Sequence, residues 1–324
     1  MNSTDNPKPT AIFLMGPTAS GKSAIAIKIA QCFPVEIISV DSAQIYRYMD
    51  IGSAKPDQEI QESVPHHLID LINPYESYSA ARFRSDALIA MQAIVARGRI
   101  PLLVGGTMMY FKVLSDGLAE LPSADKHLRD QLEQTARSEG LLALHSRLKL
   151  LDPVTAAGIQ PSDSQRIQRA LEVCYLTGKP MSVLLAQAQE DKWRSYFPYQ
   201  VINIALLPSD RTILHDHIAQ RFDRMLAMGL VEELSGIRQK FPVTADMPAM
   251  RCVGYRQAWC YLDNQINLAK MREMGVIATR QLAKRQLTWL RSMHDIQSFD
   301  CLASDLSSQV IDHLAKNLSD EVLC

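Results

Sequence analysis

One octapeptide near the amino terminus restricts the possible folds more than any other segment. Residues 16–23 read GPTASGKS and match the pattern G-x-x-x-x-G-K-[S/T] without a mismatch. The apolar run 11–15 before them and the Ala- and Ile-rich stretch 23–32 after them predict the strand–loop–helix arrangement that this loop requires. Backbone N–H groups of such a loop and of the helix start bind phosphate oxygens. The residues expected to bind phosphate are Gly16, Pro17, Thr18, Ala19, Ser20, Gly21, Lys22 and Ser23.

Apolar strands and helical stretches alternate around this loop. Residues 35–40 (VEIISV), 101–104 (PLLV) and 201–207 (VINIALL) predict buried strands, and 79–97 predicts a helix. A further strand is expected at 68–72. Continuous apolar strands alternating with helices are typical of a parallel sheet covered on both faces.

The segment 118–197 interrupts the alternation, because its pattern is helical throughout, with helices predicted at 126–138 and 163–176. We therefore predict an α/β fold: a P-loop parallel sheet flanked by helices, with an inserted all-helical subdomain. The P-loop core comprises 10–117 and 198–314, and the subdomain comprises 118–197.

Composition excludes several classes of protein. The 324 residues carry 34 Lys and Arg against 35 Asp and Glu, and 47% are hydrophobic, which is typical of a globular protein. No run of 18 apolar residues predicts a membrane span, and the polar residues 1–9 do not predict a signal peptide. The six cysteines show no metal-site or disulfide spacing, so we expect reduced thiols in a cytoplasmic protein. The net charge of −1 argues weakly against a nucleic-acid partner.

The chemistry beside the P-loop depends on one acidic residue. Lys22 adds positive charge to the phosphate site, and the hydroxyl of Ser23 suits Mg²⁺. Kinases and ATPases normally hold Mg²⁺ with an acid at the end of another core strand, but the strand at 100–104 ends in Gly105-Gly106-Thr107. Asp41 instead follows the second strand, in the ligand crevice of a parallel sheet. It can act as a general base, as a metal partner or only as a helix N-cap.

Eight sequence blocks in order resemble one family. They are GPTASGKS, DSAQIY (41–46), IGSAKP (51–56), VPHHLID (64–70), GGTMMY (105–110), QRIQRALE (165–172), RCVGYRQAW (251–259) and TRQLAKRQLTWLR (279–291). The order is similar to that of the tRNA dimethylallyltransferases, also called tRNA isopentenyltransferases. Ser23 replaces a common Thr, and Cys252 stands where a small residue such as Ala is usual. The zinc-finger extension of eukaryotic members is absent, so the chain resembles a bacterial form.

The resemblance implies transfer of a dimethylallyl group from dimethylallyl diphosphate to N6 of the adenosine at tRNA position 37, beside the anticodon. The P-loop then holds the leaving diphosphate, and no phosphoryl group is transferred. This explains why the strand at 100–104 ends without the acid that kinases and ATPases use to hold Mg²⁺. Asp41 is the expected base, and Lys22, Thr107 and Mg²⁺ neutralise the departing diphosphate. An arginine of the segment 221–224 joins them; Arg221 matches the family best and Arg224 is second.

The resemblance also implies a surface for the anticodon stem-loop of tRNA. The implied contact residues are Asp41, Ser42, Ala43, Gln44, Thr107, Arg129, Gln165, Arg166, Ile167, Gln168, Arg169, Arg251, Cys252, Val253, Gly254, Tyr255 and Arg256. From the residues themselves, Gln165, Gln168 and Gln257 have side chains that can read base edges. Residues 270–291 hold six basic side chains against Glu273, a local charge of +5, with Arg280, Lys284 and Arg291 on one stripe of a predicted helix. Such a stripe binds RNA phosphates or forms an ordinary solvated face.

Two other functions remain open from the residues alone. A P-loop kinase of small molecules or nucleotides also combines this loop with a nearby acid, although the strand-end acid is missing. A noncatalytic RNA-binding protein with a relic phosphate site is the other alternative, against which the intact Lys22, Asp41 and Thr107 argue. We expect a monomer with no membrane partner.

Overall fold

The computed structural model describes residues 8–119, 121–190 and 197–318. The chain divides after Ser115 and again before Pro198 into two compact units, which are described separately. The first, called the α/β unit, holds both ends of the chain, and the second, called the helical unit, holds the segment between the two divisions. This division lies close to the boundaries expected for the P-loop core and its insertion.

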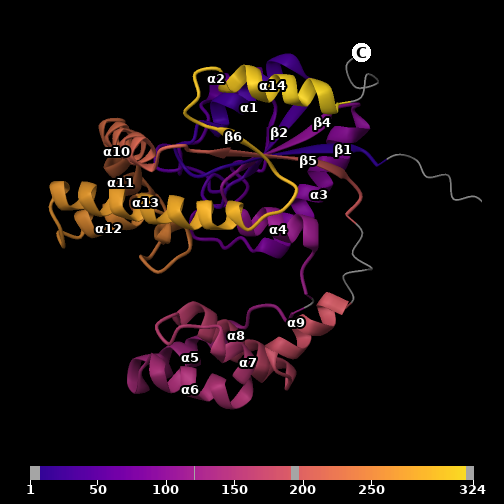
Figure 1. The fold of residues 1–324 in the computed structure, drawn as a ribbon. Helices are drawn as coiled ribbons and strands as arrows, with labels where there is room; N and C mark the ends of the chain where they lie inside the picture. Colours follow the sequence, from indigo (N-terminus) through magenta and orange to yellow (C-terminus); the bar gives the residue numbers. More distant parts are fainter. Residues whose placement is uncertain (1–7, 120, 191–196, 319–324) are drawn as a thin grey trace, which may run out of the picture. The chain divides into compact units, whose positions relative to one another are not determined.

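Six strands form the centre of the α/β unit (Figure 1). They are β1 (Thr10–Met15), β2 (Val35–Val40), β3 (His66–His67), β4 (Ile100–Gly105), β5 (Gln200–Leu207) and β6 (Gln297–Asp300). Its helices are α1 (Lys22–Cys32), α2 (Gln58–Ser63), α3 (Ala80–Ala96), α4 (Met108–Asp116), α10 (Arg211–Ala227), α11 (Leu230–Lys240), the 3-10 helix η2 (Ala249–Arg251), α12 (Tyr255–Leu262), α13 (Leu268–Arg291) and α14 (Leu306–Asn317).

All strand pairs of the sheet are parallel, in the order β3-β2-β4-β1-β5-β6. The central strands β1, β2 and β4 are almost entirely buried, which is why their sequences are continuously apolar. The predicted parallel sheet is confirmed, with strands at four of the five expected places. The P-loop therefore follows a central strand of the sheet.

The strand expected at 68–72 is wrong. The strand after β2 is instead the two-residue β3. Within 68–72, Ile72 forms an isolated bridge with Tyr46. Leu68 and Asp70 have φ angles of 61° and 55°, and this left-handed conformation cannot continue a strand. The edge strand β6 was not predicted, because its sequence QSFD lacks the apolar pattern of the central strands.

The two faces of the sheet are covered by different helices (Figure 1). Ile12 and Leu14 of β1 pack into a cluster with α1 and α14. Phe13 points to the other face, where its ring lies 5.1 Å from that of Phe111 in α4. Since successive strand residues alternate between faces, the apolar run of β1 supplies both cores.

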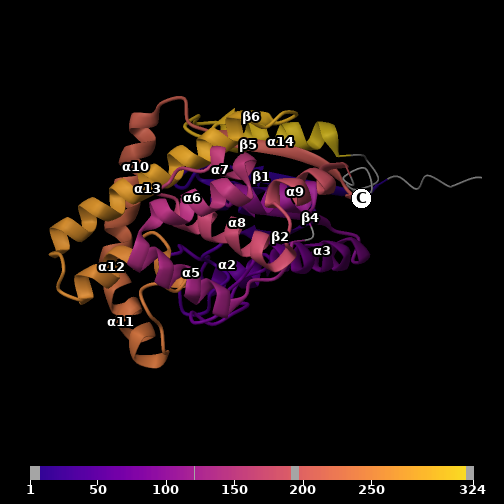
Figure 2. The same ribbon diagram turned by 90° about the horizontal axis from the view of Figure 1, so that it is seen from below.

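A second core lies beyond the strands. It joins Tyr46 and Met49 of the segment after β2 to buried side chains of α10, α11, α12 and α13. Figure 2 shows α13 as a long helix beside α10 and α12. Gly275 of α13 packs against the ring of Phe222 from α10, and Arg272 of α13 forms a two-bonded ion pair with Asp223. These contacts fix α10 on α13.

The helical unit contains α5 (Lys126–Glu139), α6 (Leu141–Leu151), α7 (Pro153–Ala157), α8 (Ser164–Thr177) and α9 (Met181–Glu190). Asp125 and Asp163 cap α5 and α8 by accepting backbone N–H groups. Leu132, Leu148 and Ile167 belong to its apolar core. The expectation of helix from 118 onward is wrong, since the first helix of this unit begins at Lys126.

No helix within the described residues has both the length and the apolar character needed to cross a bilayer.

Two glycines should respond oppositely to alanine. A Cβ at Gly275 would overlap the buried ring of Phe222, whereas a Cβ at Gly236 in α11 meets nothing within 4 Å. We expect Gly275→Ala to lower the free energy of unfolding by about 1–3 kcal/mol through overpacking. Gly236→Ala should raise it by about 0.5–1 kcal/mol, because alanine favours helix. Urea unfolding of both variants tests this, and equal effects would contradict it.

Candidate active site

The P-loop leaves the N–H groups at the start of α1 available to a ligand, because no side chain among the described residues caps this helix. A Cβ on Gly16 would lie 2.7 Å from Ser20 Oγ and 3.0 Å from the Leu206 carbonyl, so only glycine fits there. Gly21 has a φ of 81° at the N-cap of α1 and offers no side chain to the first turn. The N–H groups of that turn, which includes Ser23 with its exposed side chain, therefore remain available to an anion.

Lys22 folds back onto its own loop. Its Nζ donates to the Pro17 carbonyl at 2.6 Å and to Ser20 Oγ at 3.4 Å. Burial, followed by the neighbouring charge of Arg221, lowers the pKa of Lys22 to about 7, although the charge of Asp41 acts in the opposite direction. The site therefore disfavours the lysine charge until an anion arrives.

Arg221 places a second cation beside the loop. It projects from α10, and among the described residues it makes no ion pair or hydrogen bond. Burial lowers its pKa, the charge of Asp41 raises it and that of Arg224 lowers it again. Arg224, the second candidate of the sequence analysis, is exposed on the same helix. Two desolvated cations with one nearby carboxylate form a site for an anion of multiple charge.

Asp41 and Thr107 form the acidic side of the site. Asp41 Oδ1 accepts the N–H groups of Ala43 at 2.8 Å and Gln44 at 3.4 Å, so the carboxylate does cap the following turn. Its Oδ2 has no hydrogen bond within the described part of the chain. Thr107 Oγ1 accepts the N–H of Ser42 at 3.1 Å, which leaves its hydroxyl hydrogen to donate. The carboxylate is thus held at one oxygen and available at the other.

Sequence reasoning missed Gln286, which lies inside the block TRQLAKRQLTWLR. Its side chain is buried, its Oε1 accepts the Thr18 N–H at 2.9 Å, and its Nε2 donates to the Gly106 carbonyl at 2.9 Å. Only its burial distinguishes it from other polar residues of α13, and no sequence pattern reports that burial.

Two further polar groups, the half-buried Glu233 and the buried side chain of Lys55, were also missed. Glu233 of α11 accepts the N–H groups of Asp50 and Ile51, both at 2.8 Å, and the hydroxyl of Tyr255 at 2.6 Å. Lys55, with 3% of its side chain exposed, donates to the Tyr46 carbonyl and pairs with Asp50 and Asp70. These contacts hold the segment after β2 against the second core.

The expected RNA contacts of the α/β unit separate into exposed and inward-facing residues. Ser42, Arg251 and Arg256 are exposed, whereas Ala43 and Val253 are half-buried. Gln44 points inward, where it accepts from Ser39 Oγ and donates to the Ala54 carbonyl.

The remaining residues of the RCVGYRQAW block support the surface from beneath. Tyr255 is fully buried, and Gln257 Oε1 accepts the N–H of Gly254, whose φ is 94°. Burial, and then the charge of Asp41, raises the pKa of Cys252 to about 12. The Tyr255 and Gln257 side chains therefore do not face solvent as RNA contacts.

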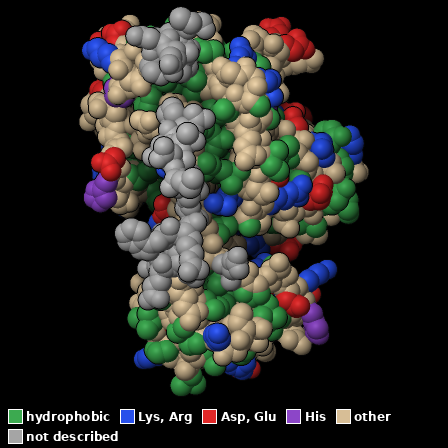
Figure 3. Space-filling view, turned by 90° about the vertical axis from the view of Figure 1, so that its right-hand side faces the viewer, with side chains coloured by type: hydrophobic (Ala, Val, Ile, Leu, Met, Phe, Trp, Pro, Cys, Tyr) green, Lys and Arg blue, Asp and Glu red, His purple; other side chains and the backbone are tan. Residues whose placement is uncertain are grey.

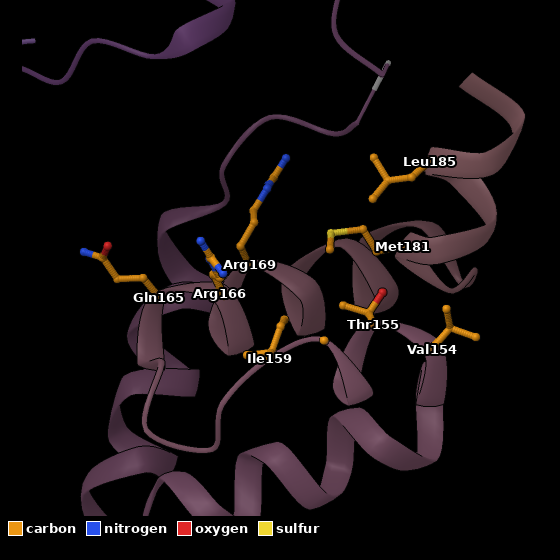
Figure 4. A pocket seen from close by; sticks show the side chains of 9 residues that line it. Val154, Thr155, Ile159, Gln165, Arg166, Arg169, Met181 and Leu185 are labelled. Atoms are coloured by element: carbon orange, nitrogen blue, oxygen red, sulfur yellow. The ribbon is translucent and has the colours of Figure 1, made fainter. Parts of the chain in front are cut away.

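The helical unit divides its expected contacts in the same way. Gln165 and Arg166 are exposed, and they line an open pocket together with Val154, Met181 and Leu185 (Figure 4). Arg169, which is half-buried, lines the same pocket. Of the other expected residues, Ile167 is buried, and Gln168 and Arg129 are half-buried.

Those four residues hold the helical unit together. Ile167 is fully buried, and Gln168 Nε2 donates to the Arg129 carbonyl at 3.0 Å. Arg129 and Arg169 both pair with the fully buried Glu172. Burial raises the pKa of Glu172, but the hydrogen bonds from both guanidinium groups outweigh it and leave this pKa below its ordinary value.

Basic side chains of α13 form an exposed row. Lys284, Arg285 and Arg291 are exposed, whereas Arg280 is half-buried and its Nε lacks a hydrogen-bond partner within the described structure. On the face of the molecule drawn in Figure 3, by contrast, blue and red side chains are interspersed. Positive charge on this chain is therefore local.

Comparison with known proteins gives the family. The family model described as IPP transferase matches residues 44–293, and that described as Isopentenyl transferase matches residues 9–72. The tRNA dimethylallyltransferase of Nitrosomonas eutropha is 66% identical over 316 residues, which cover 98% of each chain. That of Nitrosomonas europaea is 65% identical over 312 residues, which cover 96% of this chain and 97% of the relative.

Solved structures of similar proteins share the fold. The full-length tRNA isopentenylpyrophosphate transferase from Bacillus halodurans has a TM-score of 0.69 at 34% identity, covering 97% of this chain and 98% of that chain. A eukaryotic dimethylallyltransferase acting on tRNA has a TM-score of 0.77 at 25% identity, covering 96% of this chain and 80% of that one.

The fold, the site and these matches define a P-loop α/β enzyme that transfers a prenyl group. The phosphate loop, two cations and a carboxylate occupy one end of its parallel sheet. The chain belongs to the tRNA dimethylallyltransferase family.

The charge of Lys22 should depend on pH and on its ligand. Between about pH 7 and pH 10 the unfolded chain holds a proton on Lys22 that the folded, ligand-free chain has lost. The stability of the ligand-free protein should therefore gain from this group as pH rises through that window. A bound diphosphate raises the pKa again, so binding at pH 8 should take up close to one proton.

Calorimetry of inorganic diphosphate binding, without Mg²⁺ and in buffers of different ionisation enthalpy, measures this uptake. Lys22→Arg is the control, because a guanidinium stays charged in both states. Equal proton uptake by the two proteins would contradict the assignment.

Glu172 should be critical to the helical unit. Glu172→Gln removes the charge that two guanidinium groups share at a fully buried position, and we expect a loss of about 2–4 kcal/mol. Glu133→Gln is the matched control, because its pair with Arg137 is exposed and contributes under about 0.5 kcal/mol. Hydrogen–deuterium exchange of α5 and α8 measures both, and equal protection in the two variants would refute the prediction.

Proposed function

We propose that the chain transfers a dimethylallyl group from dimethylallyl diphosphate to N6 of an adenosine beside the tRNA anticodon, at position 37, and releases diphosphate. The single observation that carries the chemistry is the meeting of two desolvated cations, Lys22 and Arg221, with the partly free carboxylate of Asp41 at the end of the sheet. The family membership of the chain supports the substrate assignment.

The cationic side of the site acts on the leaving group. As the bond from the allylic carbon to oxygen breaks, negative charge grows on the diphosphate. Donors already in place stabilise this charge without reorganisation. The N–H groups of the first turn of α1 and Arg221 supply such donors, and Thr107 adds a hydroxyl. Lys22 must exchange its bonds to the P-loop for bonds to the ligand.

The acidic side of the site acts on the nucleophile. The lone pair of an adenine amino group is delocalised into the ring, so the group attacks carbon well only as its proton leaves. Asp41 accepts that proton at Oδ2, while backbone N–H groups hold Oδ1. The carboxylate is therefore oriented before substrate binds.

Mg²⁺ fits the donors that this site presents. No cluster of three or more His, Cys, Asp or Glu side chains in the described residues could form a cage for a metal ion. Mg²⁺ commonly binds through one or two protein oxygens together with phosphate oxygens and water. The exposed Ser23 hydroxyl offers such an oxygen. When bound, Mg²⁺ would neutralise part of the charge on the diphosphate.

Exposed basic side chains on each of the two units support a role in binding tRNA. Arg166, Arg251, Arg256, Lys284 and Arg291 are exposed and can contact phosphates. Target bases within a folded loop must leave their stack to reach an active site. Within the helical unit Ile167 contributes packing, and within the α/β unit Tyr255 and Gln44 contribute packing and internal hydrogen bonds.

Phosphoryl transfer is less consistent with the geometry. β4 ends in Gly105 without an acidic side chain, so the strand beside the P-loop offers no carboxylate for the metal of a kinase. A purely RNA-binding role would not require two desolvated basic side chains, Lys22 and Arg221, close to each other and to Asp41.

We also propose that the enzyme acts as a monomer in the cytoplasm. The five cysteines in the described part of the chain are all free, which suits a reducing compartment. Light scattering at micromolar concentration tests the first part, with one chain of 36.3 kDa expected.

One assay tests the reaction. The enzyme is incubated with unmodified tRNA, Mg²⁺ and dimethylallyl diphosphate, and digested nucleosides are analysed by mass. We expect prenylated adenosine, and a roughly 100- to 10,000-fold lower rate for Asp41→Asn, which keeps the shape of the side chain but removes the base. Affinity for tRNA should change little.

Asp216→Asn is the control, because Asp216 is exposed on α10. ATP-dependent phosphorylation of a metabolite with no prenylated product would overturn the proposed function. Loss of tRNA binding by Asp41→Asn, with an unchanged rate at saturating tRNA, would make Asp41 a recognition residue instead.

A further inference from the structure

Gln286 connects the two loops that border the phosphate site. It lies on α13, 268 residues along the chain from the Thr18 N–H that it accepts, and it also donates to the Gly106 carbonyl. Both bonds measure 2.9 Å, and the side chain is 8% exposed. A Cβ on Gly106 would overlap the amide nitrogen of Gln286. These two hydrogen bonds form a bridge between the loops. The bridge requires glycine at position 106 and, at position 286, a side chain that both donates and accepts.

The bridge continues to the proposed base. Gly106 precedes Thr107, whose backbone N–H donates to the Val40 carbonyl at 3.2 Å and whose Oγ1 accepts the Ser42 N–H. Val40 and Ser42 flank Asp41. A displacement of the Gly106 carbonyl would thus move the segment that carries Asp41 relative to the P-loop.

The same helix also fixes the second cation. Gly275 of α13 packs against Phe222, and Arg272 of α13 pairs with Asp223 at 2.7 Å through Nη2. Phe222 and Asp223 are the two residues that directly follow Arg221 in α10. One helix therefore holds the P-loop and the Gly106 loop at one point and the Arg221 segment at another.

We propose that Gln286 is a positioning residue for the diphosphate site, which sets the spacing between the P-loop and the Gly105–Thr107 loop. The proposal rests on the proposed function in taking diphosphate as the ligand. Gln286 itself touches backbone atoms and no substrate. Its effect is to keep the loop donors and Asp41 at a fixed separation, so that ligand binding does not have to restore it.

The first test replaces Gln286 with methionine. Gln286→Met has a similar volume but leaves the Thr18 N–H and the Gly106 carbonyl without their partners. We expect the affinity for inorganic diphosphate to fall about 10- to 100-fold, and the transfer rate to fall with it. Affinity for tRNA without the donor should stay within a few-fold of the wild type. Gln239→Met, at an exposed site on α11, is the matched control.

The second test uses Gln286→Glu and pH. A neutral carboxylic acid accepts and donates as the amide does, whereas a carboxylate cannot donate to the Gly106 carbonyl and repels diphosphate. Burial at this position disfavours the charged form and raises the pKa of the new carboxyl group. The ratio of diphosphate affinities, Gln286→Glu over wild type, should therefore rise towards one as pH falls from 8 to 4.5. Taking the ratio cancels the titration of free diphosphate, which is common to both proteins.

Either variant can overturn the proposal. Diphosphate binding by Gln286→Met equal to that of the wild type would do so, and so would a flat ratio for Gln286→Glu across this pH range if the methionine variant does not fold. Diphosphate binding is measured without transfer. A wild-type protein that binds diphosphate but prenylates no tRNA would therefore refute the proposed function and leave the Gln286 assignment standing on its own data.

Discussion

The register of three parallel strands decides where the chemistry of this chain takes place. Met15 of β1 and Val40 of β2 are both paired with Gly105 of β4, so the three strands end at one level. The next residues along the chain are Gly16, Asp41 and Gly106. A Cβ on Gly105 would overlap the Val40 carbonyl, so the close approach of β2 and β4 requires glycine there. The backbone hydrogen bonds between these strands therefore bring together the P-loop, the Asp41 carboxylate and the Gly105–Thr107 loop.

Much of this arrangement could be predicted because it is encoded locally. The P-loop pattern and the apolar runs of β1, β2 and β4 each lie in a few adjacent residues. The strand at 68–72 failed because positive φ angles at Leu68 and Asp70 do not show in hydropathy. The edge strand β6 was missed because pairing along a single edge imposes no apolar pattern on it.

Side-chain direction was the larger gap in predicting the site. A residue's place in a block that resembles the family does not say whether its side chain faces a ligand or packs beneath another side chain that faces it. Ile167, Tyr255 and Gln44 lie in blocks assigned to RNA, yet two are buried and the third bonds inward. Gln286 and Glu233 act through contacts across 180 or more residues, which no short pattern can encode. Whole-chain charge misled for a related reason, since it averages the exposed row on α13 with acids elsewhere.

The position of the helical unit in the topology has a consequence for how such a protein can vary. β4 and β5 lie on either side of β1, so the connection between them is a crossover that passes over a strand already in the sheet. The helical unit is an enlargement of that crossover, entered through α4 directly after Thr107. Lengthening or exchanging a crossover leaves strand order and register unchanged. The site at the end of the sheet can thus keep its geometry while the sequence and length of the inserted helices change.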